Sequence, residues 1–174
     1  MTTIAYGIED RDAYLQGRQA ALEYCRQHGF PEWSMVEMPV QWSEQDPNNH
    51  LNNVVYAKYM ETGRLTFIKS VHQQIKAQFP PQVPQSQVIL ARIELDYLKP
   101  TFSPDTMCVA HKCIEINERK MVLECMLFSY NQRAKVAQGK AYMIAFRYDL
   151  QKVGQYTKEF QTFVQQTIKP VSKL

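Results

Sequence analysis

Three polar side chains that could carry out catalysis alternate within the short run Asp46-Pro47-Asn48-Asn49-His50. In an extended chain, side chains at positions i, i+2 and i+4 share a face, so these three groups could converge on one ligand atom. A carboxylate can activate water as a general base or attack directly as a nucleophile. An imidazole titrates near neutral pH and can pass a proton. We therefore take Asp46, Asn48 and His50 as candidate catalytic residues.

A helix is expected directly after this run, over about 53–77, and its first N–H groups could bind a developing oxyanion. Backbone N–H groups at a helix N-terminus lack intrahelical partners, so those around Asn52, Asn53 and Val54 could polarise a carbonyl oxygen. The same residues also fit a purely structural role. Asp-Pro-Asn-Asn is typical of turns, and Asn52 or Asn53 could cap the helix. The residues alone leave both interpretations open.

The flanking patterns predict the elements that must position these groups. A strand over 36–43 leads into the run, and Pro39 indicates a position near a sheet edge or a local break. The helix over 53–77 is apolar around most of its circumference, which indicates a buried helix. Lone Gly139 within a strand predicts a bulge or a close backbone approach. Four further alternating segments with short links, which favour antiparallel pairing, are expected at 87–98, 105–117, 119–131 and 134–148.

This order of elements indicates an α+β protein in which an antiparallel sheet wraps one long central helix. The chain also resembles the hotdog-fold thioesterases, a group that includes 4-hydroxybenzoyl-CoA thioesterase and plant acyl-ACP thioesterases. The resemblance covers about 36–150, with a helical extension over 1–35 and a helix and tail over 151–174. The segments that carry it are Gln41-Trp42-Ser43-Glu44-Gln45-Asp46, His50-Leu51-Asn52-Asn53, the residues Tyr56, Tyr59, Glu61 and Arg64, and Ile93-Glu94-Leu95-Asp96-Tyr97-Leu98-Lys99-Pro100.

The resemblance implies hydrolysis of an acyl-CoA thioester to a free acid and coenzyme A, with no cofactor. An aspartate at the position of Asp46 is catalytic in the acyl-CoA branch, and the plant branch uses the Asp-x-Asn-x-His pattern found here. A glutamate of the plant enzymes has no counterpart, and the glycine usual before the histidine is Asn49. Whether Asp46 acts as base or nucleophile therefore stays open.

The acyl group and the phosphates of coenzyme A also have candidate contacts in the sequence. Tyr56 and Tyr59 follow on the predicted helix and could line the acyl pocket. Lys99 belongs to a group of basic residues at strand ends and turns. A solvated surface is their ordinary role, but some of them could hold the phosphates of coenzyme A.

Two other functions compete with hydrolysis. The first is a hotdog (R)-specific enoyl-CoA hydratase. Those enzymes carry the histidine five residues after the aspartate, whereas His50 is four residues after Asp46. A shift of one residue turns a side chain to the opposite face of an extended segment. The second is a non-catalytic hotdog protein that binds acyl-CoA.

Composition limits the class of protein. A chain of 174 residues with a net charge of +3 is expected to form one globular domain and not to bind nucleic acid. No two histidines stand at metal-ligand spacing, so we expect no metal. The four cysteines lack the CxxC spacing and are expected to be small buried hydrophobes.

Location and assembly have sequence signals too. The tripeptide Ser172-Lys173-Leu174 is a peroxisomal address when it ends a protein, which implies a peroxisomal import receptor as a partner and a matrix location. No apolar run reaches the ~20 residues needed to span a bilayer, so a soluble, intracellular and reduced protein is expected. The family resemblance implies a homodimer or a homotetramer.

Overall fold

The computed structural model describes residues 11–78 and 87–168. Its helices and strands follow the expected order, and the two short segments Glu32–Ser34 and Trp42–Glu44 are 3-10 helices. The major elements are α1 (Arg11–His28), β1 (Val36–Val40), α2 (Asn53–Gln78), β2 (Val88–Tyr97), β3 (Asp105–Ile116), β4 (Lys120–Ser129), β5 (Ala134–Arg147), β6 (Lys152–Val153) and α3 (Lys158–Thr167).

All strands belong to one antiparallel sheet with the order β1-β3-β4-β5-β2, and β6 pairs with the end of β5. The four predicted return strands are confirmed. Pro39 lies in β1 at one edge of the sheet, as its missing N–H requires. The first strand ends at Val40 rather than at 43, because Trp42–Glu44 turns into a 3-10 helix.

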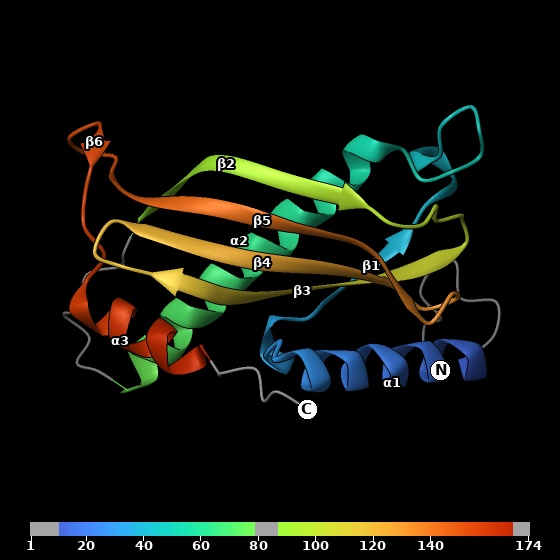
Figure 1. Ribbon diagram of the computed structural model, residues 1–174, viewed down its shortest axis with the longest axis horizontal. Coiled ribbons are helices and arrows are strands. Elements are labelled where there is room, and N and C mark those ends of the chain that lie inside the picture. The colour runs from blue at the N-terminus through green and yellow to red at the C-terminus, as the bar shows by residue number, and fades with distance from the viewer. Residues whose placement is uncertain (1–10, 79–86, 169–174) are drawn as a thin grey trace.

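The long helix α2 crosses one face of this sheet and is seen behind the strands in Figure 1. Its buried side chains, among them Tyr59, Met60 and Phe67, pack against residues of β3, β4 and β5 in one apolar core. Its opposite side is exposed at Val54 and Leu65. The sheet and its central helix thus form the predicted hotdog fold.

The outer face of the sheet is covered only in part. In β3, Val109 faces the core around α2, whereas Cys108 and Ala110 belong to a second cluster beneath α1. This second cluster also takes Ala21 and Cys25 from α1. The helix α1 therefore packs on the side of the sheet away from α2 and covers β3 and β4, whereas Glu94, Asp96, Gln138 and Lys140 form a polar region on the same side of β2 and β5.

The chain after β5 returns to the main core. Phe160, Phe163 and Val164 of α3 are buried in the same apolar cluster as α2, and Figure 1 shows α3 beside one end of that helix. The division of the chain into an extension, a central domain and a tail stays a prediction. Residues Phe79-Pro80-Pro81, predicted to end the helix, and Ser172-Lys173-Leu174 lie outside the described residues.

All four cysteines are buried and free, which confirms that they serve as small hydrophobes. Within residues 11–78 and 87–168, none of the helices is both long and apolar enough to cross a membrane.

Candidate functional site

The run that carries the three candidate catalytic residues is a closed loop, so the expectation of an extended segment is wrong. Gln45 and Leu51 form an isolated antiparallel bridge, and the N–H of Asp46 donates to the carbonyl of His50 at 2.7 Å. Asn49 adopts a left-handed backbone with φ of 61°. Pro47 and a residue that tolerates positive φ favour a tight turn, and this turn outweighs the alternation of the side chains.

The carboxylate of Asp46 holds this loop together. Its Oδ1 accepts hydrogen bonds from the backbone N–H of Asn48 at 2.8 Å and of His50 at 3.2 Å. Its Oδ2 has a single long contact, 3.5 Å from the side-chain amide of Asn48. The structural interpretation of the run as a turn is therefore confirmed, and among the described residues Oδ2 has fewer and longer contacts than Oδ1.

Opposing effects set the pKa of Asp46. Partial desolvation is the largest single effect and raises the pKa, whereas hydrogen bonds from the backbone of His50 and Asn48 and from the Asn48 side chain lower it. The nearby His50 imidazole lowers it further. The net result is a pKa below the ordinary aspartate value, so this carboxylate is ionised at neutral pH.

His50 meets Asp46 through its backbone rather than through its ring. The imidazole packs edge-on against Phe102, with ring centroids 5.3 Å apart. No hydrogen bond joins the ring to the Asp46 carboxylate in the part of the chain that the structure describes. A proton relay between the two side chains would need a bridging molecule or a rotation of the ring.

The N-terminus of α2 is capped by Asn52, as one of the two open interpretations expected. The side chain of Asn52 accepts from the N–H of Val54 at 3.2 Å, and its carbonyl accepts from Val55 at 2.9 Å. Its own N–H donates to the carbonyl of Glu44 at 2.9 Å. Of the three N–H groups proposed for an oxyanion, only that of Asn53 has no acceptor among the described residues.

An open pocket of about 340 Å³ brings several candidates together. Of the predicted site residues, it is lined by Asp46, His50, Asn53, Tyr56 and Lys99. Its other lining residues are Leu51, Tyr97, Leu98 and Pro100. Loop, helix N-terminus and the end of β2 therefore meet at one place.

Tyr97 is a lining residue to which the sequence assigned no role. Its hydroxyl donates to the carbonyl of Asn53 at 3.1 Å, and its ring stands edge-on to that of Tyr56 at 5.3 Å. It belongs to the segment 93–100 that carried the family resemblance, which is the only signal that pointed to it.

Four predicted residues, Asn48, Asn52, Val54 and Tyr59, do not line this pocket, and Asn52 instead caps α2. Asn48 lies exposed in the loop, and Val54 is 65% exposed on the outer side of α2. Tyr59 is only 1% exposed, and its hydroxyl donates to the Glu44 carboxylate, with the Pro39 carbonyl as a second acceptor at 3.1 Å. Burial, followed by the hydrogen bond to Glu44, raises the pKa of Tyr59 far above its ordinary value.

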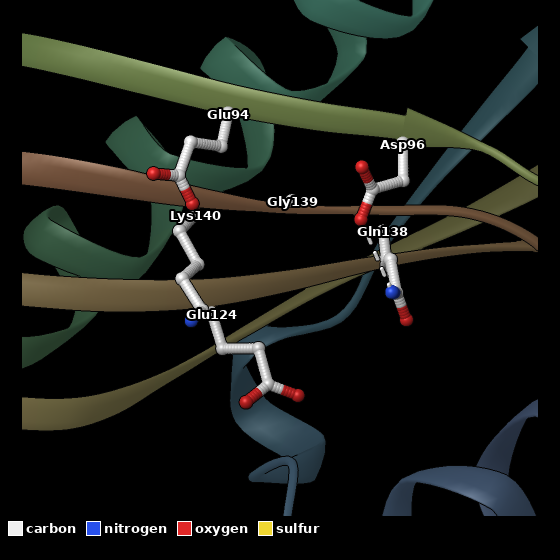
Figure 2. Close-up of a pocket in the computed structure, with 6 residues that line it drawn as sticks. All are labelled: Glu94, Asp96, Glu124, Gln138, Gly139 and Lys140. Atoms are coloured by element: carbon white, nitrogen blue, oxygen red, sulfur yellow. Dashed lines mark hydrogen bonds between the residues drawn. The ribbon is translucent and has the colours of Figure 1, made fainter.

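A second pocket, of about 310 Å³, lies on the polar outer face of the sheet. Figure 2 shows Glu94, Glu124 and Lys140 side by side on adjacent strands, with α2 behind the sheet. Lys140 is the register partner of both glutamates, so the charges alternate across β4, β5 and β2. Such cross-strand pairs stabilise a solvated sheet face. With Asp96, the pocket has three carboxylates and one ammonium in its lining, and Arg92 and Lys112 pair with Glu94 and Glu124 at 2.7 and 3.4 Å.

Among residues 11–78 and 87–168, no group of three or more His, Cys, Asp or Glu side chains is arranged to hold a metal ion.

Solved structures with the same fold include several thioesterases. A Thermus thermophilus thioesterase described as complexed with coenzyme A and Zn has a TM-score of 0.65 and 20% identity, covering 82% of this chain and 98% of that one. A thioesterase superfamily protein from Jannaschia sp. CCS1 has a TM-score of 0.66 and 17% identity, with coverages of 83% and 91%. A DHNA-CoA thioesterase from Staphylococcus aureus has a TM-score of 0.62 and 16% identity, covering 76% of this chain and 88% of that one.

The sequence itself matches no curated protein. A family model does match, over residues 40–168, and it spans the loop with Asp46, the helix α2, the strands β2 to β6 and α3. Because this match covers most of the chain and the fold agrees with it, the chain belongs to the Thioesterase-like superfamily.

Proposed function

We propose that this protein hydrolyses acyl-CoA thioesters to a free acid and coenzyme A, with Asp46 as general base or nucleophile. The observation that carries the proposal is the pocket in which Asp46 and the N-terminus of α2 meet. Hydrolysis needs a group that attacks or activates water and a donor for the oxygen that becomes negative. Family membership supports the broader class of thioester hydrolase.

In this mechanism, Oδ2 of Asp46 accepts a proton from water as the water oxygen attacks the thioester carbonyl, or it attacks that carbon itself. The free N–H of Asn53 donates to the developing oxyanion. The carbon–sulfur bond then breaks, and the thiolate of coenzyme A leaves and takes up a proton. In the nucleophilic route, water hydrolyses the mixed anhydride and regenerates the carboxylate.

The substrate has matching contacts around this centre. Tyr56 and Tyr97 offer aromatic surface to the acyl group, and exposed Lys99 offers a positive charge to the phosphates of coenzyme A. The coenzyme A described in the Thermus thermophilus relative supports the choice of leaving group. A peroxisomal location through Ser172-Lys173-Leu174 stays a prediction.

The test is a series of three variants assayed with saturated acyl-CoA of several chain lengths, with release of free thiol as the readout. Asp46→Asn keeps the shape of the side chain and removes the base, so kcat should fall by about 1000-fold or more while KM changes little. His50→Ala and Asn48→Ala should each lower kcat by about 10- to 1000-fold.

Three results would contradict the proposal. Near wild-type turnover by Asp46→Asn would remove the carboxylate from the mechanism. A wild-type protein that cleaves no acyl-CoA but hydrates trans-2-enoyl-CoA would be a hydratase, and one that binds acyl-CoA without turnover would be a binding protein.

A further inference from the structure

Glu44 stands two residues before Asp46 and is nearly buried, with a side chain only 13% exposed. A carboxylate withdrawn from water in this way needs several partners. Its Oε2 accepts from the Tyr59 hydroxyl and from the N–H of Gln41 at 3.1 Å. Its Oε1 lies 3.3 Å from the ammonium of Lys58. Two of these partners, Tyr59 and Lys58, belong to α2, so the side chain ties the start of the loop to the helix.

The main chain of Glu44 holds the other end of the same loop. Its carbonyl accepts from the N–H of Asn52, the residue that caps α2. Residues 44 and 52 flank the loop that closes between Gln45 and Leu51, so one residue fixes both of its ends. The loop itself is exposed at residues 47–49 and has little packing of its own.

Tyr59 is buried and hydrogen-bonded to Glu44, so it is placed to fix Glu44 rather than to bind a ligand. Its ring is buried in the main core, and its single hydroxyl proton has two acceptors, the Glu44 carboxylate and the Pro39 carbonyl. The charged carboxylate is the stronger acceptor. If Glu44 is lost, the hydroxyl can turn to Pro39, so the core keeps its hydrogen bond while the loop loses its anchor.

We infer that Glu44 is a positioning residue for Asp46, acting through Tyr59 to hold the loop against α2. This inference rests on the proposed function, in which Asp46 acts on the substrate. A small displacement of a reacting group can cost about 100-fold in rate, and an anchor of this kind prevents such a displacement. Glu44 itself does not line the pocket and touches no reacting atom.

The first test compares Tyr59→Phe with a matched control. Tyr130 is likewise buried, and its hydroxyl donates to a glutamate, Glu37, at 3.0 Å, but this pair lies beneath α1. We expect Tyr59→Phe to lower kcat by about 10-fold with KM within about 2-fold, and Tyr130→Phe to keep the wild-type kcat. Equal losses of kcat in both variants would reduce the role of Tyr59 to general stability and overturn the inference.

The second test compares a conservative substitution of Glu44, which keeps a hydrogen-bond acceptor, with one that removes it. Glu44→Gln keeps an oxygen that can accept from Tyr59 and Gln41, so kcat should stay within about 3-fold of the wild-type value. Glu44→Leu fills the space without an acceptor and should lower kcat by about 10- to 100-fold. Wild-type kcat in a folded Glu44→Leu variant would overturn the inference.

Hydrogen exchange separates this inference from the proposed function. The backbone N–H groups of Asn48 and His50 are bonded to Asp46 only while the loop is closed. Their exchange should be at least about 10-fold faster in Tyr59→Phe and Glu44→Leu than in the wild type or Tyr130→Phe. The faster exchange is expected even if the wild type cleaves no thioester. Unchanged exchange in both variants would show that Glu44 and Tyr59 do not anchor the loop.

Discussion

At the residue scale, one carboxylate has two roles. Oδ1 of Asp46 closes the loop through the N–H groups of Asn48 and His50, and in the proposed mechanism Oδ2 acts at the pocket that Asp46 lines. The turn and the proposed catalytic role are therefore compatible, because they use different oxygens of the carboxylate. The same hydrogen bonds favour the charged form and hold the pKa of Asp46 below the ordinary value, against the effect of desolvation.

This lowered pKa predicts the pH dependence of the reaction. Asp46 stays charged above the ordinary aspartate pKa of ~3.9, so protonation of Asp46 should not limit kcat/KM until the pH falls below about 4. Because the pKa of Asp46 is lower in the folded state than in the unfolded state, its charge also stabilises the fold. This stabilisation is fully present above the unfolded-state pKa and is lost as the pH falls through the folded-state pKa. A kcat/KM profile from pH 4 to 8 measures the first effect. An acid limb well above pH 4 in the wild type would contradict this expectation.

At the scale of elements, Gly139 in β5 marks a close approach of β5 to both β2 and α2. A Cβ built on Gly139 would lie 2.3 Å from the Glu94 carbonyl of β2 and 3.2 Å from Sδ of Met60 in α2. The predicted close backbone approach is confirmed. This glycine lets β2, which carries Tyr97 to the pocket, pair closely with β5 while Met60 of α2 packs at the same point.

Gly139→Ala should therefore destabilise the protein, because the added methyl group must push backbone rather than a flexible side chain. We expect a loss of about 1–3 kcal/mol in the free energy of unfolding, measured by chemical denaturation. Gln138→Ala, a change on the outward-facing neighbour, is the control and should cost less than about 1 kcal/mol. Equal stability of Gly139→Ala and the wild type would show that β2 and β5 can move apart at this point without a loss of free energy.

At the scale of the whole molecule, β2 is an edge strand with an apolar surface. No other strand in the described part of the chain pairs with its outer edge. Leu90, Ile93 and Tyr97 are 37%, 39% and 51% exposed. Unpaired edges with apolar side chains favour pairing with another chain, which supports a homodimer joined at β2.

Light scattering at micromolar concentration should report a dimer. Ile93→Lys places a charge on the exposed strand and should shift the protein to a monomer. Val153→Lys, at a 55% exposed position on β6, should leave the dimer intact. A monomeric wild type would contradict the edge pairing, and so would a dimer that both substitutions leave unchanged.

The sequence by itself determined the fold and the neighbourhood of the site. Alternation in the four return segments and the apolar circumference of α2 reflect burial, which is a local property of side-chain order. The choice of Asp46 and His50, and of the N-terminus of α2, also came from residue type and spacing. The structure places all of these around one pocket.

Only the tertiary structure decided how these groups are used. The loop closes because backbone N–H groups of Asn48 and His50 reach the Asp46 carboxylate, a contact that side-chain periodicity does not encode. The hydroxyl of Tyr59 was expected in the acyl pocket, but it bonds to Glu44, 15 residues away in sequence. Hydrogen bonds between separate elements depend on how helix and loop pack together, so no local pattern could predict them.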